Sequence, residues 1–241
     1  MTRVAVVTGG SRGIGRATAE RLAADGQAVV IVYAGNKAEA DKAVAEITSK
    51  GGQAVAAQAD VADEKAVAAV FDLAEQTFGG VDVVVNSAGI MPLGTVADMD
   101  LDTFDKIMRT NARGTFVVAQ QAARRLRSGG ALVNISSSVV GLRFPQYGAY
   151  AMSKGGVEAL TLVLARELRG RDVTVNVVAP GPTATDLFLD GKDQATIDNL
   201  AKQAPLERIG TPDDIAEVIS FLAGPARWIN GQVVRANGGI I

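Results

Sequence analysis

Short apolar runs recur along this chain, and a longer segment with helical periodicity follows almost every one of them. The runs are nearly continuous in Val, Ala, Ile and Leu, and residues 28–33 read Ala-Val-Val-Ile-Val-Tyr. Strands with one solvent-exposed face alternate apolar and polar residues. Strands buried on both faces are apolar throughout, as in parallel sheets covered by helices. The pattern therefore predicts an α/β fold of the Rossmann type, with a doubly wound parallel sheet of seven strands flanked by helices and joined by right-handed crossovers.

The predicted elements form one continuous series. No low-complexity linker or change in composition divides the sequence, so we expect residues 1–241 to form a single domain. A long irregular stretch at about 181–210, preceded by Pro180, is expected to be a substrate lid. Strands are predicted near residues 3–8, 28–33, 54–58, 82–86, 131–136, 173–178 and 232–236, and helices near 14–25, 37–50, 64–77, 102–127, 149–169 and 212–223.

The residue types present restrict the chemistry. The chain has 24 basic and 26 acidic residues dispersed along its length, which disfavours nucleic acid or an anionic membrane as a partner. It has no cysteine and no histidine, so thiol nucleophiles, imidazole bases and most metal sites are excluded, and no metal is expected. Proton transfer must then use Tyr, Lys, Asp or Glu. The absence of a leader pattern and of an apolar run of membrane-spanning length predicts a soluble cytoplasmic protein.

A glycine-rich turn joins the first predicted strand to the first predicted helix. Residues 8–15 read Thr-Gly-Gly-Ser-Arg-Gly-Ile-Gly, with glycines where a backbone must turn tightly, approach a phosphate and let a helix pack against a strand. Helix N–H groups and the helix dipole would then face the pyrophosphate of a dinucleotide. An ordinary glycine-rich turn explains any one of these glycines better than it explains three at this spacing.

The end of the second predicted strand bears on which dinucleotide is bound. A carboxylate about 20 residues past the glycines would bind the adenosine ribose and repel a 2′-phosphate. Residues 33–37 read Tyr-Ala-Gly-Asn-Lys and contain no carboxylate, while Arg12 lies in the glycine loop and Lys37 follows the strand. We therefore predict NADP (NADPH) as the cofactor, with both cations able to meet the phosphate. A solvated Lys37 is an equally good interpretation of that residue.

Tyr150 and Lys154 form a Tyr-x-x-x-Lys pattern at the start of a predicted helix. Their i, i+4 spacing places the phenol and the ammonium group on one helix face. A free tyrosine has a pKa near 10, and lowering it by about three units requires roughly 4 kcal/mol of preferential phenolate stabilisation, part of which a nearby ammonium supplies. Taken alone the pattern is weak evidence, because an amphipathic helix also explains both residues.

Several motifs occur together along the chain, in order and at regular spacing. They are the glycine loop Thr8 to Gly15, Asp60-Val61, Asn86-Ser87-Ala88-Gly89, Asn111, the Tyr150–Lys154 pair and Pro180 to Thr185. On these motifs the chain resembles the short-chain dehydrogenase/reductase (SDR) family over essentially its whole length, and within it the 3-oxoacyl-carrier-protein reductase-like ketoreductases. Ser87 departs from that pattern, since it replaces the second asparagine of the motif after strand four.

The resemblance implies hydride transfer from a nicotinamide to a carbonyl carbon. Tyr150 would give the carbonyl oxygen its proton, and Ser137 would hydrogen-bond that oxygen. Lys154 would lower the Tyr150 pKa and hold the nicotinamide ribose, while Asn111 would position a water for proton resupply. Counting from the fifth strand, and back from Tyr150, selects Ser137 as the serine, whereas aligning the residues that follow selects Ser138; we choose Ser137.

The family pattern assigns cofactor contacts residue by residue. These residues come from the glycine loop, from the ends of the second, third and fourth strands, from the catalytic helix and from the Pro-Gly segment. The implied cofactor-binding residues are Gly9, Ser11, Arg12, Gly13, Ile14, Gly15, Tyr33, Asn36, Asp60, Val61, Asn86, Ala88, Gly89, Tyr150, Lys154, Pro180, Gly181, Thr183 and Thr185.

The predicted function is NADPH-dependent reduction of a small-molecule ketone or other carbonyl, with a 3-oxoacyl thioester as one candidate substrate. A broad-specificity carbonyl reductase or alcohol dehydrogenase, and a catalytically idle nucleotide-binding sensor, remain open. The expected substrate border is mostly apolar. It comprises Met91, Pro92, Leu93, Arg143, Phe144, Tyr147, Leu187, Phe188 and Leu189.

Two kinds of protein partner are expected. The helices at 102–127 and 149–169 are more apolar than one buried stripe requires, and the segment from Trp228 onward can meet a symmetry mate, so we predict a homotetramer. An acyl carrier protein could dock on a basic cluster at two helix ends, although basic residues in a last helical turn more often only complement the helix dipole. That cluster comprises Arg124, Arg125, Arg127, Arg169 and Arg171.

Overall fold

The computed structural model, which describes residues 2–241, contains one seven-stranded sheet in the order β3-β2-β1-β4-β5-β6-β7. Every neighbouring pair of strands is parallel. The predicted seven-stranded parallel sheet is therefore confirmed. Its strands are β1 (Val4–Thr8), β2 (Ala28–Tyr33), β3 (Gln53–Gln58), β4 (Val81–Asn86), β5 (Leu126–Ile135), β6 (Thr174–Pro180) and β7 (Val233–Ala236).

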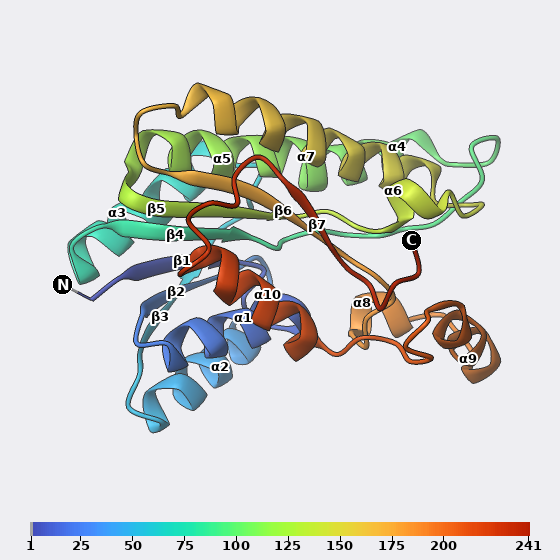
Figure 1. Ribbon diagram of the computed structural model, residues 1–241, viewed down its shortest axis with the longest axis horizontal. Helices are drawn as coiled ribbons and strands as arrows, with labels where there is room; N and C mark the ends of the chain where they lie inside the picture. The colour runs from blue at the N-terminus through green and yellow to red at the C-terminus, as the bar shows by residue number, and fades with distance from the viewer. Residues whose placement is uncertain (1) are drawn as a thin grey trace.

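Helices cover both faces of this sheet (Figure 1). Successive strand residues point to opposite faces, and in β2 Val30 and Val32 enter one core while Val29 and Ile31 enter the other. Continuous apolar strands are thus explained, because both faces are buried. One face is covered by α1 (Gly13–Ala24), α2 (Lys37–Ser49) and α10 (Pro212–Ala223), and the other by α3 (Glu64–Phe78), α5 (Gly114–Arg125) and α7 (Gly148–Glu167).

The strand order creates a crevice at the middle of the sheet. From β1 the chain moves outward through β2 to β3, and it then returns to β4 on the other side of β1. Loops that leave β1 and β4 therefore diverge at the carboxyl ends of these strands, which is where doubly wound sheets bind ligands. The glycine loop follows β1 at this point, and residues 87–89 follow β4.

The single helix predicted at 102–127 is wrong in two respects. The segment is divided into α4 (Leu101–Ile107), a π-helical turn η1 (Met108–Arg113) and α5, which ends at Arg125. The chain enters β5 at Leu126, five residues before the predicted start at 131, so Arg127 belongs to a strand. A neighbouring strand supplies the reason: the Arg127 guanidinium donates to the Asp82 carboxylate of β4, with 2.8 Å between Nε and Oδ1.

The stretch at 181–210 is not irregular throughout. It contains α8 (Asp186–Leu189) and α9 (Gln194–Gln203), which lie beyond the carboxyl end of β6 (Figure 1). Thr185 and Asp193 cap their first turns by accepting hydrogen bonds from backbone N–H groups. The sequence analysis also missed α6 (Val139–Leu142). Among residues 2–241, no helix has the length and apolar character needed to cross a membrane.

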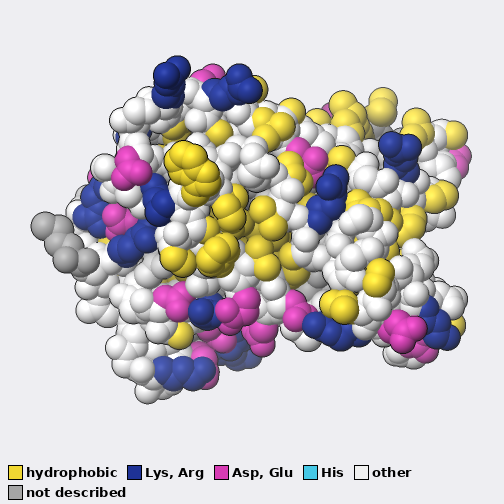
Figure 2. Space-filling view, in the orientation of Figure 1, with side chains coloured by type: hydrophobic (Ala, Val, Ile, Leu, Met, Phe, Trp, Pro, Cys, Tyr) yellow, Lys and Arg dark blue, Asp and Glu magenta, His cyan; other side chains and the backbone are white. Residues whose placement is uncertain are grey.

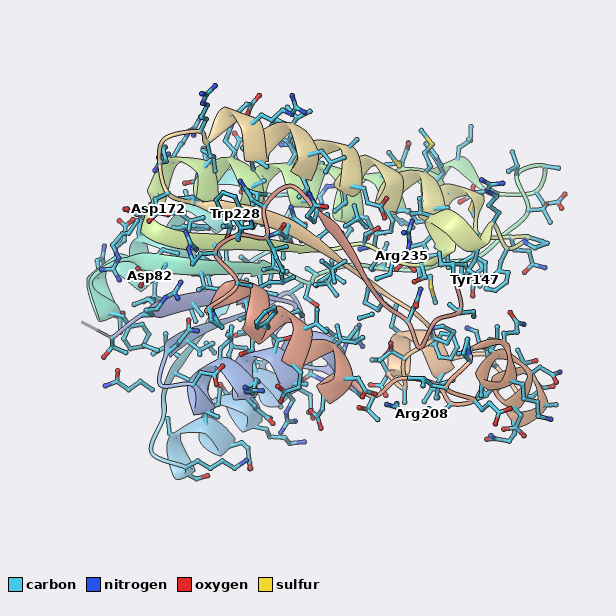
Figure 3. All side chains as sticks on the ribbon, viewed as in Figure 1. Asp82, Tyr147, Asp172, Arg208, Trp228 and Arg235 are labelled. Atoms are coloured by element: carbon cyan, nitrogen blue, oxygen red, sulfur yellow. The ribbon has the colours of Figure 1, made fainter. Side chains whose placement is uncertain are left out.

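The basic cluster proposed as a docking surface is largely paired within the chain. Arg125 donates to Asp72 and Glu75, with 2.6 Å from Nη2 to each carboxylate. Arg127 is paired with Asp82, and Arg171 donates to the backbone carbonyls of residues 123 and 126. Asp82 and Asp172 mark this end of the sheet in Figure 3, well away from Tyr147 at the opposite end. Within residues 2–241, Arg124 and Arg169 are the arginines of this cluster for which no ion pair or side-chain hydrogen bond is seen.

Candidate active site

A cavity of about 610 Å³ opens where the strands end. Its walls come from the segments that follow β1, β2, β3, β4, β5 and β6, and from the start of α7. Of the catalytic and cofactor-binding residues that the family pattern assigns, only Asn86 and Asn111 are absent from its lining. The cavity is lined by Gly9, Ser11, Arg12, Gly13, Ile14, Gly15, Tyr33, Asn36, Asp60, Val61, Ala88, Gly89, Ser137, Tyr150, Lys154, Pro180, Gly181, Thr183 and Thr185 among the predicted residues.

The glycine loop lines the cavity with backbone that carries no side chain at Gly9, Gly13 and Gly15. Gly13 has a φ of 53°, in the left-handed region that favours glycine, and a Cβ on Gly15 would collide with the carbonyl of Gly9. Helix α1 begins here with no side-chain cap at Arg12 and no acidic residue in its first turn. By contrast, Asn36 caps α2 and Asp63 caps α3. The free amide groups of α1 and its dipole therefore make this turn suitable for an anion.

Charged groups from α1 and α2 surround one end of the cavity. Arg12 is exposed and lines it, and within residues 2–241 its guanidinium has no recorded ion pair or hydrogen bond. Lys37 instead pairs with Asp41 one turn along α2, at 2.7 Å, and is not part of the lining. This ion pair favours the solvated interpretation of Lys37, and its role as a phosphate ligand stays a prediction. Glu39, which the sequence analysis missed, does line the cavity.

Asp60 borders the same end of the cavity. Its carboxylate accepts hydrogen bonds from the backbone N–H of Ala62 at 2.9 Å and from Arg109 at 2.6 Å. Burial raises the pKa of this carboxyl, but these two donors outweigh burial, so the pKa of Asp60 lies below its ordinary value. Asp60 therefore stays ionised at neutral pH and is held by groups on its own chain.

Ser137, Tyr150 and Lys154 meet at the other end of the cavity. The side chains of Tyr150 and Lys154 come from the first turns of α7, and both residues are buried, with 7% and 5% exposed. The Lys154 ammonium donates to the carbonyl of Ile135 at 2.8 Å and lies 5.7 Å from the centre of the Tyr150 ring. Helical spacing has thus placed the two groups on one face, as predicted from the sequence.

Burial controls the ionisation of this pair. It raises the pKa of Tyr150 to about 12, which the Ser137 hydroxyl opposes and the Tyr147 phenol reinforces. Burial also lowers the pKa of Lys154 to about 8. Desolvation of the phenol therefore dominates the pKa of Tyr150 in the described chain, and the lowering of that pKa by Lys154 stays a prediction. At neutral pH the phenol keeps its proton and most Lys154 side chains are charged.

The three consecutive serines have different surroundings. Ser137 faces the cavity and Tyr150. Ser138 is buried behind it, where its hydroxyl donates to the carbonyl of Ala179 at 3.1 Å and accepts from Asn237 at 3.0 Å. Ser136 donates to Glu158 of α7 at 2.7 Å. Of the two candidates from the sequence, Ser137 has its hydroxyl available to a ligand, whereas Ser138 ties β6 to the C-terminal segment.

Asn86 and Asn111 support the site from behind. The Asn86 carboxamide accepts from Thr8 at 2.9 Å, and Thr8 in turn accepts from the backbone N–H groups of Ser87 and Ala88 at 3.1 Å. The Asn111 carboxamide lies in the π-helical turn and accepts from Ile90 N–H at 2.9 Å. Its N–H groups donate to the Ile90 carbonyl and to the Ser153 hydroxyl. Both asparagines therefore fix the loops that follow β4.

Residues 9–241 match the family described as enoyl-(acyl carrier protein) reductase. A "Short-chain type dehydrogenase/reductase" of Picea abies is 44% identical, over 98% of this chain and 92% of the relative. This chain is a short-chain dehydrogenase/reductase. An "NADPH-dependent aldehyde reductase-like protein, chloroplastic" of Arabidopsis thaliana is 41% identical, over 99% and 94%. A crystal structure of a short-chain dehydrogenase from Burkholderia cenocepacia J2315 in complex with NADP superposes with a TM-score of 0.93, at 40% identity and 99% and 97% coverage.

The substrate side of this SDR is only partly what the sequence suggests. Met91, Leu187 and Phe188 line the cavity, and the other six expected border residues do not. Tyr147 nevertheless continues an aromatic row from Tyr150, with ring centres 6.4 Å apart at an edge-on angle of 67°. Phe144 extends that row, 6.0 Å from Tyr147. The wall beside the reactive end is therefore apolar and aromatic.

Proposed function

We propose that this chain reduces a carbonyl group to an alcohol with NADPH. The observation that carries the proposal is that Ser137 and Tyr150, with a charged Lys154 beside them, offer two hydroxyl groups to the same end of the cavity. The Tyr150 phenol is protonated at neutral pH because burial raises its pKa to about 12, and the charged Lys154 beside it would favour release of that proton. The similarity to an NADPH-dependent aldehyde reductase-like protein and to a short-chain dehydrogenase in complex with NADP supports the choice of cofactor.

The cavity fits a nicotinamide dinucleotide. The uncapped start of α1 suits a pyrophosphate, and the unpaired Arg12 suits a 2′-phosphate. When bound, the reduced nicotinamide supplies the hydride. Lys154 and the segment from Pro180 to Thr185 would hold its ribose and carboxamide end, and Asp60 and Val61 the adenine end.

Each residue at the reactive end then has a separate task. Tyr150 donates its proton to the carbonyl oxygen, and Ser137 hydrogen-bonds the same oxygen as negative charge develops on it. Lys154 stabilises the phenolate that remains, since an ammonium group in a buried site acts strongly on a neighbouring charge. Asn111 holds the loop at Ile90, and its proposed role in positioning a water for proton resupply stays a prediction.

Carbonyl reduction fits this geometry better than reduction of a carbon–carbon double bond. Both hydroxyls are hydrogen-bond donors to one oxygen, whereas saturation of an enoyl group ends with a proton on carbon. A ketone or aldehyde is thus the proposed substrate class, and a 3-oxoacyl thioester is a specific candidate within it. Docking of an acyl carrier protein stays a prediction with less support, because most of the basic cluster is paired.

The test is oxidation of NADPH with a panel of substrates. The panel contains simple ketones, an aldehyde, a 3-oxoacyl thioester and a 2-enoyl thioester, each with NADPH and with NADH. We expect turnover of carbonyl compounds and none of the enoyl thioester. Tight NADPH binding without turnover of any carbonyl would identify a nucleotide-binding sensor instead.

We also infer that residues 181–210 form a lid over the substrate. Helix α8 of this segment carries Leu187 and Phe188 into the cavity wall. The Lys192 ammonium donates to the Phe188 carbonyl at 2.6 Å and lies 4.7 Å from the centre of its ring, which ties the end of α8 together. Protection of 181–210 from proteolysis when NADPH and product are added together would support a lid, and equal cleavage with and without them would contradict it.

A homotetramer is proposed from two separate apolar surfaces. Figure 2 shows hydrophobic side chains gathered over β7, and Trp228, labelled in Figure 3, lies just before that strand. Trp228 is fully exposed and Phe221 is about half exposed, while Phe116 of α5 and Val163 of α7 form a second exposed pair. Two independent self-complementary surfaces generate a tetramer of dihedral symmetry. Light scattering is expected to give four chains per particle, and a monomer at micromolar concentration would contradict this.

A further inference from the structure

Glu39 brings a carboxylate into a cavity end where the sequence suggests there is none. It lies in the first turn of α2, three residues after the Asn36 cap, and its backbone N–H donates to the Asn36 side chain at 3.2 Å. Its side chain lines the same cavity end as Arg12 and is 34% exposed. A carboxylate from helix α2 therefore lines the cavity, although no carboxylate directly follows β2.

Glu39 is also part of a chain of ion pairs between α1 and α2. Its carboxylate pairs with Lys42 at 2.7 Å and with Arg16 at 3.8 Å, and Arg16 is shared with Glu20 at 2.7 Å. The hydrogen bond and charge of Lys42 hold the pKa of Glu39 below its ordinary value, so the group is ionised at neutral pH. Once these pairs are counted, Arg12 is the one positive charge of the group that no carboxylate opposes.

We propose that Glu39 is a cofactor-discriminating residue, which repels the 2′-phosphate of NADP(H) and accepts a hydrogen bond from the 2′-hydroxyl of NAD(H). This inference rests on the proposed function, because it assigns the adenosine end of the cofactor to the cavity end at Arg12. Arg12 then raises the affinity for NADPH relative to NADH, and Glu39 lowers it. Glu39 also keeps Arg16 engaged, so that this second guanidinium is not free for the phosphate.

The size of the effect follows from the exposure of the group. A phosphate monoester carries nearly two negative charges at neutral pH. One negative charge removed a few ångströms away, in a partly hydrated site, changes affinity by about tenfold, and salt reduces the change. The affinity for NAD(H), which has no charge at that position, should change little, because the Gln carboxamide oxygen can still accept a hydrogen bond from the 2′-hydroxyl.

The test compares Glu39→Gln with Glu46→Gln. Glu46 is a matched control, because it lies on the same helix and pairs with Lys50 at 2.7 Å but does not line the cavity. Dissociation constants of NADP⁺ and NAD⁺ are measured by calorimetry, with no turnover required. Glu39→Gln is expected to raise the preference for NADP⁺ over NAD⁺ about tenfold at low salt and less at high salt, whereas Glu46→Gln leaves it unchanged.

The outcomes separate this inference from the proposed function. An unchanged preference in Glu39→Gln, or weaker NADP⁺ binding, would overturn the role of Glu39 while leaving the reductase proposal intact. Wild type that binds neither dinucleotide would overturn both. Glu39→Asp retains the charge, so it should keep the wild-type preference; if it behaves like Glu39→Gln, side-chain length rather than charge is responsible and the inference fails.

Discussion

The two ends of the cavity use charge in opposite ways. At the reactive end Tyr150 and Lys154 are buried, and desolvation moves both pKa values by about two units or more, to about 12 and about 8. At the adenosine end Arg12 and Glu39 are exposed or half-exposed, and the ion pairs there are in contact with water. Burial thus sets the ionisation of the two groups at the reactive end, whereas the exposed charges at the other end change the binding free energy of the cofactor by small amounts. Substitutions at the two ends should therefore differ in effect by orders of magnitude.

The largest effect is expected from Tyr150→Phe. The substitution removes the proton-donating oxygen and keeps the ring against Tyr147, so kcat should fall by about a thousandfold or more, toward the upper range for general acid catalysis. Steady-state kinetics with the best ketone of the panel measures this fall, while the dissociation constant of NADPH should change little. Activity within tenfold of wild type would show that another group supplies the proton.

The second-largest fall in kcat is expected from Ser137→Ala, and Ser138→Ala is the variant to compare with it. Loss of the Ser137 hydroxyl removes a hydrogen bond to the developing oxyanion and is expected to lower kcat by about a hundredfold. Ser138→Ala removes the 3.0 Å acceptor of the Asn237 carboxamide and the hydrogen bond to the Ala179 carbonyl, so it should lower the melting temperature and leave kcat nearly unchanged. Kinetics and thermal melts of both variants decide the matter, and the reverse ranking would transfer the catalytic role to Ser138.

The pH dependence of reduction tests the buried lysine. Lys154 is charged below its pKa of about 8, so kcat/KM should be level at lower pH and fall about tenfold per pH unit above about 8. Tyr150 does not contribute to this fall, because its pKa of about 12 keeps it protonated over that range. Lys154→Arg should move the fall to higher pH in any residual activity. An unchanged profile in that variant would assign the titration to another group.

Lys154 should also make folding stability pH-dependent. Its folded-state pKa lies below the unfolded value of about 10.4, so the protonated side chain is disfavoured by folding. The contribution of Lys154 to the free energy of unfolding therefore increases as pH rises from about 8 toward about 10, and it is lowest below about 8. Urea melts of wild type and Lys154→Met across this range should diverge most at the lower pH values. Parallel curves would indicate that the ammonium is solvated.

The smallest effects are expected at the adenosine end. Arg12→Gln should weaken NADP⁺ binding about tenfold and NAD⁺ binding little, because only the former has a phosphate for the unpaired guanidinium. Lys37→Gln should change neither, since that ammonium is committed to Asp41. Calorimetric titrations at low salt compare the two variants. Equal losses in both would restore Lys37 as a phosphate ligand.

The sequence predicted best where local signals agree with the fold. Strand β2 and helix α10 were predicted with both ends correct; β2 is continuously apolar, and α10 has Thr211 as its cap and Pro212 at its first position. Ser137, Tyr150 and Lys154 were predicted from the family pattern, and the structure brings all three to the cavity. The predictions that failed concern residues whose positions depend on partners distant in the sequence. Arg127 lies in a strand, where it pairs with Asp82 of the neighbouring strand. Glu39 lines the cavity because α2 packs beside α1. No local pattern encodes such pairings.

Trp228, the single tryptophan of the chain, is a natural optical probe. An indole in water emits at longer wavelength than one enclosed by protein, and this indole is fully exposed in the isolated chain and far from the reactive residues. A shift to shorter wavelength on concentrating the protein would therefore report coverage of the β7 surface without any label. Because no second indole contributes, the same signal would yield the association constant and its dependence on salt or cofactor directly.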